Sequence, residues 1–212
     1  MRIIMIGPQG AGKGTQGEKL AERYVVPHVA TGDLLRAAVR EGSPLGQEAH
    51  SYMDAGELVP DDLVQAMLRE RLARPDAADG FILDGYPRNP AQAASLLQML
   101  EEIGAGVDAV VSLEVPDDIL VTRLSARRTC PTCGRPFTIS DGHPAVCADD
   151  GTPLVQRDDD KPEAIRRRLS IFHDQTAPLI SFYQDQGLVV HVDGVGDIDE
   201  VSTRIAKALA DR

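Results

Sequence analysis

The stretch that decides the fold is GPQGAGKGT, residues 7–15. It follows the apolar run IIMI, residues 3–6, which is typical of a buried strand, and it leads into residues 16–24, which we expect to form a helix. Glycines let backbone N–H groups turn inward, and the helix N-terminus adds unpaired donors and a positive dipole end. Lys13 adds a mobile charge for the β- and γ-phosphates of a nucleotide. The stretch predicts a phosphate-binding loop; a turn that only packs helix on strand is the alternative.

The residue after the lysine departs from the general pattern of such loops. That pattern has Ser or Thr directly after the lysine, whereas this chain has Gly14 and then Thr15. A hydroxyl one residue later predicts that the metal ion of a bound nucleotide is not held as GTPases hold it.

The composition bounds the class of protein. The chain has 212 residues, of which 42% are hydrophobic, enough for one substantial core with an inserted module. Its formal net charge is −11, with 33 acidic and 22 basic residues, so its surface repels nucleic acid and anionic membranes. The sequence shows neither a membrane-spanning run nor a secretory segment at its N-terminus. We expect a cytoplasmic protein without nucleic-acid or membrane partners, in which local arginines bind any polyanionic ligand.

Apolar runs that alternate with helical patterns predict the rest of the fold. Further strands are expected at residues 27–30, 80–85, 109–113 and 188–192. Further helices are expected at residues 34–40, 45–55, 61–73, 91–103, 117–127, 162–186 and 199–211, with Thr31 or Asp33 capping the first of these and Pro178 kinking the sixth. Five strands alternating with helices predict an α/β fold with a parallel sheet covered on both faces.

Two segments interrupt this alternation. Residues 31–59 read as a small helical hairpin, which exceeds what a strand crossover needs and favours a ligand-binding insert. Residues 128–160 contain prolines, glycines, every cysteine of the chain and short β-like pieces. This second segment predicts an inserted β module.

A carboxylate stands at the end of the strand expected at residues 80–85. Ligands bind at the carboxyl ends of strands in open α/β sheets, and Asp84 occupies such an end. Asp84 is therefore a candidate to orient hydrated Mg²⁺ near the phosphates, with a capping or turn aspartate as the alternative. Arg88 brings a guanidinium to the same edge.

Arginines near the edges of the expected elements form a candidate anion site. They are Arg36, Arg88, Arg123, Arg127, Arg157 and Arg168. The planar guanidinium binds phosphate oxygens in two places and stays charged. Arg123 and Arg127 are four residues apart, so we expect them on one helix face. Any single arginine is more often a solvated surface residue, so the prediction rests on the set, in a chain that is otherwise acidic. The run DDD at residues 158–160 is either a solvated loop or a partner for an arginine.

The cysteines predict a metal site. Cys130 and Cys133 form a C-x-x-C-G knuckle, and Cys147 begins a second one in which Asp150 stands where a fourth cysteine would fall. Three thiolates and one carboxylate suit a closed, structural, tetrahedral zinc site, which a small module with little core needs. Asp149 and His143 remain alternative fourth ligands, and three ordinary thiols remain the alternative to a metal.

Four motifs carry a family resemblance. They are GPQGAGKGT at residues 7–15, TGDLLRAAV at 31–39, FILDGYPRN at 81–89 with Gln92 shortly after, and DDDKPEAIRRRL at 158–169. Together they resemble the bacterial adenylate kinases with a long, zinc-type lid, over essentially the whole chain. Gly14 after the lysine is the pattern of this kinase family.

The resemblance implies a fold, an activity and ligands. The fold is that of the P-loop-containing nucleoside triphosphate hydrolases, with a five-stranded parallel sheet. The activity is reversible phosphoryl transfer from Mg-ATP to AMP, giving two ADP and serving adenine nucleotide homeostasis. The implied protein is a monomer with Mg²⁺ on ATP and structural Zn²⁺. Its core would be residues 1–29, 60–125 and 161–212, its AMP-binding domain 30–59 and its lid 126–160.

The resemblance also implies roles for individual residues. It places ATP at Gly10, Ala11, Gly12, Lys13, Gly14, Thr15, Arg123, Arg127, Pro136, Phe137 and Gly196. It places AMP at Thr31, Arg36, Glu57, Leu58, Val59, Gly85, Tyr86, Arg88, Gln92, Arg157 and Arg168. It assigns catalysis to Lys13, Arg88, Arg127, Arg157, Arg168, Asp159 and Asp160, zinc to Cys130, Cys133, Cys147 and Asp150, and water-mediated Mg²⁺ to Asp84. Glu57 departs from relatives that carry a basic residue there.

Three other classes remain as alternatives. A uridylate/cytidylate kinase shares most of the motifs but carries Asn where this chain has Gln92. A GTPase switch needs Ser or Thr at position 14 and an Asn-Lys-x-Asp element, neither of which the sequence contains. A zinc-ribbon nucleic-acid binder needs a basic module, whereas acidic residues surround these knuckles.

Overall fold

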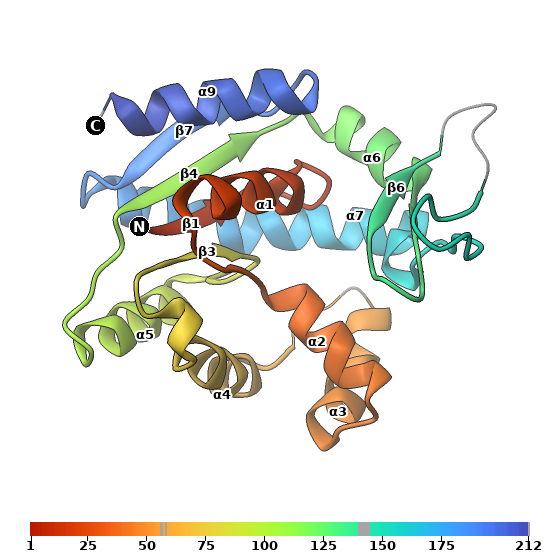
Figure 1. Cartoon of the computed structure of the whole chain (residues 1–212), viewed down its shortest axis with the longest axis horizontal. Helices are drawn as coiled ribbons and strands as arrows, with labels where there is room; N and C mark the ends of the chain where they lie inside the picture. The colour runs from red at the N-terminus through yellow and green to blue at the C-terminus, as the bar shows by residue number, and fades with distance from the viewer. Residues whose placement is uncertain (56, 58, 140–144, 212) are drawn as a thin grey trace.

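The main sheet places the strand before the phosphate loop at its centre. The computed structural model describes residues 1–55, 57, 59–139 and 145–211 (Figure 1). Its five strands run in the order β2-β3-β1-β4-β7, all pairs being parallel. They are β1 (Arg2–Ile6), β2 (His28–Ala30), β3 (Phe81–Asp84), β4 (Ala109–Glu114) and β7 (Val189–Asp193). The predicted parallel α/β fold is confirmed.

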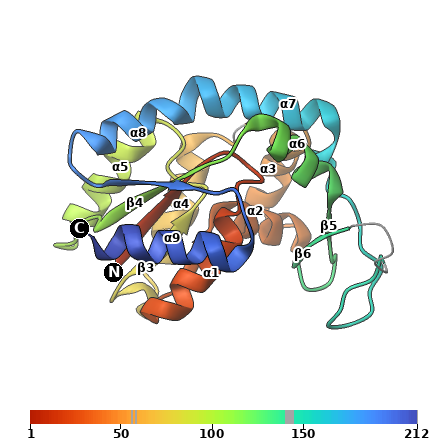
Figure 2. The ribbon, with the colours of Figure 1, turned by 90° about the horizontal axis from the view of Figure 1, so that it is seen from above.

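Helices cover both faces of this sheet. The described helices of the chain are α1 (Lys13–Tyr24), α2 (Thr31–Arg40), α3 (Pro44–Asp54), α4 (Asp61–Leu72), α5 (Pro90–Glu101), α6 (Asp117–Ala126), α7 (Pro162–Ile171), α8 (Ala177–Gln184) and α9 (Ile198–Ala210), with short turns η1 (Pro75–Ala77) and η2 (Asp158–Asp160) and a π-helical segment η3 (Phe172–Thr176). Helices α1 and α9 lie on one face, and α5 and α8 lie on the other (Figure 2). Among the described residues, no helix has the length and apolar character needed to cross a bilayer.

The apolar side chains of β1 point alternately to the two faces of the sheet and so contribute to two layers of core. Ile3 and Met5 pack in a cluster with α1 and α9, whereas Ile4 and Ile6 pack in a second cluster with α4, α5 and α8. Successive side chains of a strand point to opposite faces, so a strand covered on both faces is apolar throughout. This burial holds the loop that follows β1 on a rigid support.

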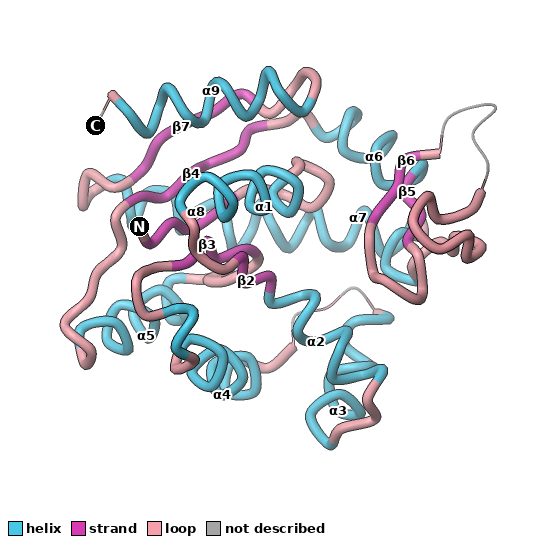
Figure 3. The backbone as a smooth tube through the Cα atoms, viewed as in Figure 1, coloured by secondary structure: helices cyan, strands magenta, loops and turns pink. Residues whose placement is uncertain are grey.

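Two smaller units stand beyond the sheet. The strands β5 (Arg127–Thr129) and β6 (Pro136–Thr138) pair antiparallel and form a separate sheet in the β module (Figure 3). Helices α2 and α3 pack on each other as the predicted hairpin. The start of β1 and the end of α9 lie at the end of the molecule opposite the β module (Figures 1 and 2).

Three local predictions are wrong. Arg127 is not helical: α6 ends at Ala126, and Arg127 takes extended dihedral angles and begins β5, so it does not share a helix face with Arg123. Thr31 and Asp33 lie inside the first turn of α2, where neither side chain caps the helix. The single helix expected at residues 162–186 is instead divided by the π-helical segment η3, because Pro178 has no N–H for the helical ladder and the N–H of Ala177 bonds Phe172 O.

Candidate active site

The phosphate loop joins β1 to α1. Gly7 has φ +151°, and a Cβ there would lie 2.7 Å from Leu113 O, so only glycine fits. Gly12, directly before α1, has φ +97°. The Lys13 ammonium donates hydrogen bonds to Gly7 O at 2.8 Å and Pro8 O at 3.0 Å. The loop therefore folds around its own lysine at the N-terminus of a helix, where an anion is favoured.

Burial makes Lys13 an unusual lysine. Removal from water lowers its pKa to about 8, against the attraction of Asp84, which raises it. The cations Arg88, Arg168 and Arg127 contribute smaller parts of the same lowering. A bound phosphate would neutralise the positive charge of this cluster.

Asp84 lies beside the phosphate loop at the carboxyl end of β3. A Cβ added at Gly14 would lie 3.7 Å from Asp84 Oδ2, which places this carboxylate against the start of α1. His28 Nε2 lies 3.9 Å from the same oxygen, and Thr31 Oγ1 donates to Asp84 O at 3.3 Å. The carboxylate thus faces the phosphate loop, as a ligand of hydrated Mg²⁺ must.

Two arginines are held by consecutive aspartates of η2. Arg127 donates to both oxygens of Asp160, from Nε at 2.7 Å and from Nη2 at 2.5 Å. Arg168 donates to Asp159 Oδ2 at 2.8 Å and to Asp159 O at 3.1 Å. Asp160 is fully buried, so its ion pair fixes the guanidinium of Arg127 rigidly. The DDD run is therefore no solvated loop at its last two positions.

Two further arginines are held by neutral partners. Arg88 Nε donates to Gly85 O at 2.7 Å, and Arg157 Nε donates to Thr129 Oγ1 at 2.7 Å. Burial lowers the pKa of each to about 10, and neighbouring arginines add to the effect, Arg168 on Arg88 and Arg36 on Arg157. Cations that depress one another's pKa form a site of concentrated positive potential in an otherwise acidic chain.

Arg123 links two loops at the opposite end of the site. Its guanidinium donates to Gly10 O at 3.4 Å and to Gly194 O at 3.2 Å. The loop after β7, which holds Gly196 with φ +131°, therefore lies against the phosphate loop. Gln16 adds a second link, because its Nε2 donates to Ile198 O at 2.8 Å.

Gln92 lies at the other side of the arginine cluster. It is 2% exposed, and its Oε1 accepts a bond from the Arg88 N–H at 2.6 Å. Its Nε2 donates to Asp61 Oδ1 at 2.6 Å. Nearby, Arg36 donates to Asp33 at 2.5 Å, and Glu57 forms an ion pair with Arg167 of α7.

A single cavity of about 1590 Å³ joins these groups. Its described lining includes every residue to which the resemblance gives a nucleotide-binding or catalytic role, except Asp160, which lies behind Arg127. Leu58 and His143 lie outside the described residues. Pro136 and Phe137 line the cavity from β6, so the β module contributes to its wall.

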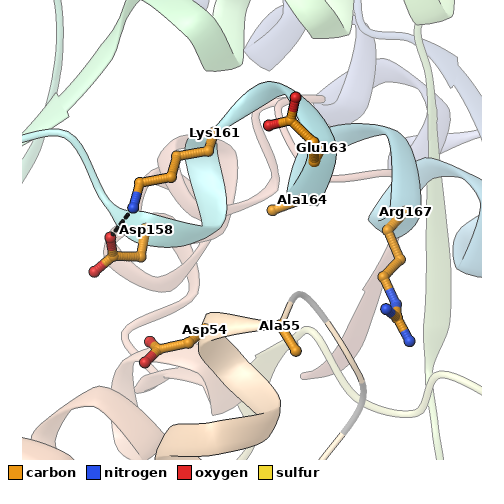
Figure 4. Close-up of a pocket in the computed structure, with 7 residues that line it drawn as sticks. All are labelled: Asp54, Ala55, Asp158, Lys161, Glu163, Ala164 and Arg167. Carbon is orange, nitrogen blue, oxygen red and sulfur yellow. Dashed lines mark ion pairs between the residues drawn. The ribbon is translucent and has the colours of Figure 1, made fainter.

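A smaller cavity of about 430 Å³ lies between α3 and α7 (Figure 4). Asp54 and Ala55 form one wall, and residues of η2 and α7 form the other, where Lys161 pairs with Asp158 at 2.6 Å. Together with the ion pair of Glu57 and Arg167, this cavity marks the contact between the helical hairpin and α7.

The cysteines converge as two similar knuckles. Gly134 N donates to Cys130 O at 2.9 Å, and Gly151 N donates to Cys147 O at the same distance. The ligand atoms of Cys130, Cys133, Cys147 and Asp150 all lie within 4.8 Å of one another. Asp149 instead pairs with Arg135 at 2.8 Å, which favours Asp150 of the two aspartates.

These four residues fit a tetrahedral zinc ion. With Zn–S bonds of about 2.3 Å and Zn–O bonds of about 2.0–2.2 Å, tetrahedral geometry requires S···S edges of about 3.8 Å and S···O edges of about 3.5 Å. The sulfurs of Cys133 and Cys147 are 3.8 Å apart, and Cys130 Sγ lies 3.5 Å from Asp150 Oδ2. Asp150 Oδ1 accepts from Thr152 N at 2.8 Å, which orients the carboxylate.

Comparisons with known proteins decide the family. The family model described as adenylate kinase matches residues 5–188. The adenylate kinase of Thermodesulfovibrio yellowstonii is 49% identical over 212 residues, 99% of each chain. That of Syntrophotalea carbinolica is 49% identical over 99% of this chain and 98% of its own, and that of Oceanobacillus iheyensis is 45% identical over 99% of each. The chain belongs to the adenylate kinase family.

Membership of the adenylate kinase family establishes the reaction. The chain is a nucleoside monophosphate kinase, which transfers a phosphoryl group reversibly from Mg-ATP to AMP and gives two ADP. The predicted activity is confirmed, and the GTPase and zinc-ribbon alternatives are excluded.

Sequence reasoning missed groups that hold the adenylate kinase site together. Asp61 and Thr129 bond Gln92 and Arg157, and His28 lies beside Asp84. None belongs to a motif with a recognisable spacing. The sequence could have prompted a search for acceptors, because every buried amide or guanidinium needs a hydrogen-bond partner.

Proposed function

We propose that this adenylate kinase performs phosphoryl transfer with Lys13, Arg88, Arg127, Arg157 and Arg168 around the group in flight. The observation that carries the proposal is their convergence on one cavity with the phosphate loop, from elements far apart in sequence. Asp159 and Asp160 hold Arg168 and Arg127 in place. Positive groups fixed before the reaction stabilise charge that spreads over the transferring oxygens.

The chemistry needs no general base. The phosphate of AMP is ionised already, so it attacks the γ-phosphorus directly, and the leaving ADP departs in line. Positioning and charge neutralisation then supply the rate enhancement. Water is the competing acceptor, and its attack would hydrolyse ATP.

We assign the two nucleotides to opposite ends of the cavity. ATP occupies the phosphate loop, with Arg123, Pro136, Phe137 and Gly196 around the rest of the nucleotide. AMP occupies the end that Thr31, Arg36, Glu57, Val59, Gly85, Tyr86 and Gln92 line. Leu58, which lies outside the described residues, is assigned to AMP by the family resemblance alone. The support is that the cations lie between these ends.

Asp84 is proposed to orient hydrated Mg²⁺. The metal, when bound with ATP, neutralises phosphate charge, and Asp84 holds its water from the end of β3. Its position against Gly14 supports this role.

Cys130, Cys133, Cys147 and Asp150 are proposed to hold structural Zn²⁺. A four-ligand site has no open position for substrate, so the ion cross-links the β module and takes no part in transfer.

We further propose that residues 30–59 and 126–160 act as the AMP-binding domain and lid, and that residues 1–29, 60–125 and 161–212 form the core. Closure of the two inserts would exclude water and complete the site only when both substrates are bound. The cavity wall supports this, because β6 and α2 both contribute to it. A monomeric, cytoplasmic enzyme without nucleic-acid or membrane partners agrees with the net charge of −11.

Kinetics of two variants test the assignment of the cations. We expect Lys13→Met and Arg88→Ala each to lower turnover by roughly 10²–10⁴, as loss of one fixed charge partner does. Arg74→Ala is the matched control, because Arg74 is exposed and is not among the described residues that line the cavity. Near-normal turnover in well-folded Lys13→Met and Arg88→Ala would remove these residues from the mechanism.

A further inference from the structure

Hydrogen bonds hold both the backbone and the side chain of Gln92. Its backbone N–H donates to Asn89 Oδ1 at 2.8 Å, and its backbone carbonyl accepts from the Tyr86 hydroxyl at 3.2 Å. Its side-chain amide bonds Arg88 N and Asp61 Oδ1, each at 2.6 Å. The side chain is buried, so it cannot exchange these partners for water without movement.

The two amide partners differ in kind. The Arg88 N–H only donates, so it selects the oxygen end of the amide, whereas an ionised carboxylate only accepts, so Asp61 selects the nitrogen end. Either contact reversed would bring two donors or two acceptors together. The pair therefore fixes which way round the amide stands.

The fixed amide keeps one donor and one acceptor free. An amide nitrogen has two N–H groups and an amide oxygen has two lone pairs, and one of each is used. Adenine presents its N1 acceptor beside its N6 amino donor, which matches this pair. Hypoxanthine and guanine present an N1–H donor beside an O6 acceptor, which would match only the reversed amide.

Asp61 stands behind Gln92. It is the first residue of α4, and it is not among the described residues that line the nucleotide cavity, whereas Gln92 is. Its second oxygen accepts from Asn89 Nδ2 at 3.1 Å, so the same carboxylate also holds the residue that caps α5. Both of its oxygens are therefore committed to orienting the segment that carries Gln92.

We propose that Asp61 is a positioning residue that fixes the amide of Gln92 in the orientation for adenine and thereby sets the preference for AMP over 6-oxopurine monophosphates. The inference rests on the proposed role of Gln92 as the residue that reads the base. Asp61 acts only through Gln92 and does not touch the nucleotide.

The variant Asp61→Asn tests this. It keeps the size of the side chain but offers a donor as well as an acceptor, so only the Arg88 N–H still selects the orientation of the Gln92 amide. The quantity to measure is the ratio of kcat/KM for AMP to that for inosine monophosphate, with Mg-ATP as donor. We expect this ratio to fall about 10- to 100-fold and the KM for AMP to rise, as when a hydrogen bond to a charged group is lost. KM for ATP and the kcat at saturating AMP should change less than about twofold.

Asp62→Asn is the matched control. Asp62 follows directly in the first turn of α4 and is exposed, so its substitution removes the same charge from the same helix end. We expect Asp62→Asn to keep the ratio of the wild type. Asp61→Ser, which removes the carboxylate and keeps a hydroxyl, repeats the test if Asp61→Asn does not fold.

The variant Gln92→Leu distinguishes the role of Gln92 in reading the base from the role of Asp61 in positioning Gln92. A collapsed ratio in Gln92→Leu with an unchanged ratio in folded Asp61→Asn would overturn the positioning role and leave Gln92 as the base reader. An unchanged ratio in Gln92→Leu would overturn both. Equal losses in Asp61→Asn and Asp62→Asn would show a charge effect on α4 and would also overturn the proposal.

Discussion

Lys13 and the arginines around it carry positive charge that the surrounding protein disfavours. Burial and neighbouring cations lower the pKa values of Lys13, Arg88 and Arg157. Hydrogen bonds to uncharged oxygens hold these three groups in place: Lys13 donates to Gly7 O and Pro8 O, Arg88 donates to Gly85 O, and Arg157 donates to Thr129 Oγ1. These buried charges destabilise the ligand-free protein, and a bound phosphate would relieve that destabilisation.

We therefore expect Lys13→Met to raise stability. The pKa of Lys13 is about 8 in the folded protein and about 10.5 in the unfolded chain, so below pH 8 the protein bears the full cost of the buried charge. Between these pH values the unfolded chain binds a proton that the folded chain lacks, so the cost fades as pH rises. After allowance for solvent screening, unfolding in urea at pH 7 should show Lys13→Met more stable by about 1–3 kcal/mol.

The same comparison at pH 10 should show most of that difference gone. A variant that is less stable than the wild type at pH 7, or a difference that does not change with pH, would contradict the account of Lys13.

The sequence predicts residue types at this scale better than it predicts their partners. Lys13 and Arg88 follow from motifs whose chemistry suits phosphate, and Gln92 follows from the family resemblance. Their partners do not: Arg127 bonds Asp160, 33 positions away, and Gln92 bonds Asp61, 31 positions away. Such pairs depend on how the elements pack, which local spacing does not encode.

Among the elements, strands and helices were predictable where apolar periodicity was strong. β1 and β4 are buried runs, and α9 begins at a capping box formed by Asp197 and Glu200. The errors lie at boundaries. Arg127 lies where a helix becomes a strand, and tertiary pairing with β6 ended the helix one residue before it. η3 is a break that helical periodicity alone does not reveal.

The β module gives a prediction at this scale. Within the described part of the module, few large apolar side chains are buried, so a metal would replace the core that it lacks. We expect one zinc ion per chain, and its removal should lower the melting temperature while leaving activity at low temperature largely intact. Asp150→Ala should lose zinc more readily than Asp149→Ala, its matched control, because Asp149 pairs with Arg135.

Elemental analysis of protein purified without chelator checks the zinc content, and calorimetry checks the melting temperature. Absence of any such metal would mean that hydrogen bonds alone close the knuckles. Loss of all activity on mild chelation, with the fold intact and Mg²⁺ restored, would refute a purely structural ion.

Across the whole molecule, the sheet topology brings together site residues that are far apart in the sequence. The carboxyl ends of parallel strands meet at one edge, so β1 and β3 deliver the phosphate loop and Asp84 to the same place. The hairpin α2–α3 and the β module then close two sides of the cavity. Periodicity predicted a parallel sheet but not the strand order β2-β3-β1-β4-β7, which depends on long-range packing.

The most direct test is a screen of phosphoryl acceptors. Purified protein and Mg-ATP are mixed with AMP, UMP, CMP or GMP in turn, and the products are followed by ³¹P NMR. The account predicts rapid, reversible formation of two ADP from ATP and AMP, with the other acceptors slower by at least about 10²-fold, because a buried amide left half-paired penalises the wrong base. Phosphorylation of UMP or CMP as fast as that of AMP would contradict it.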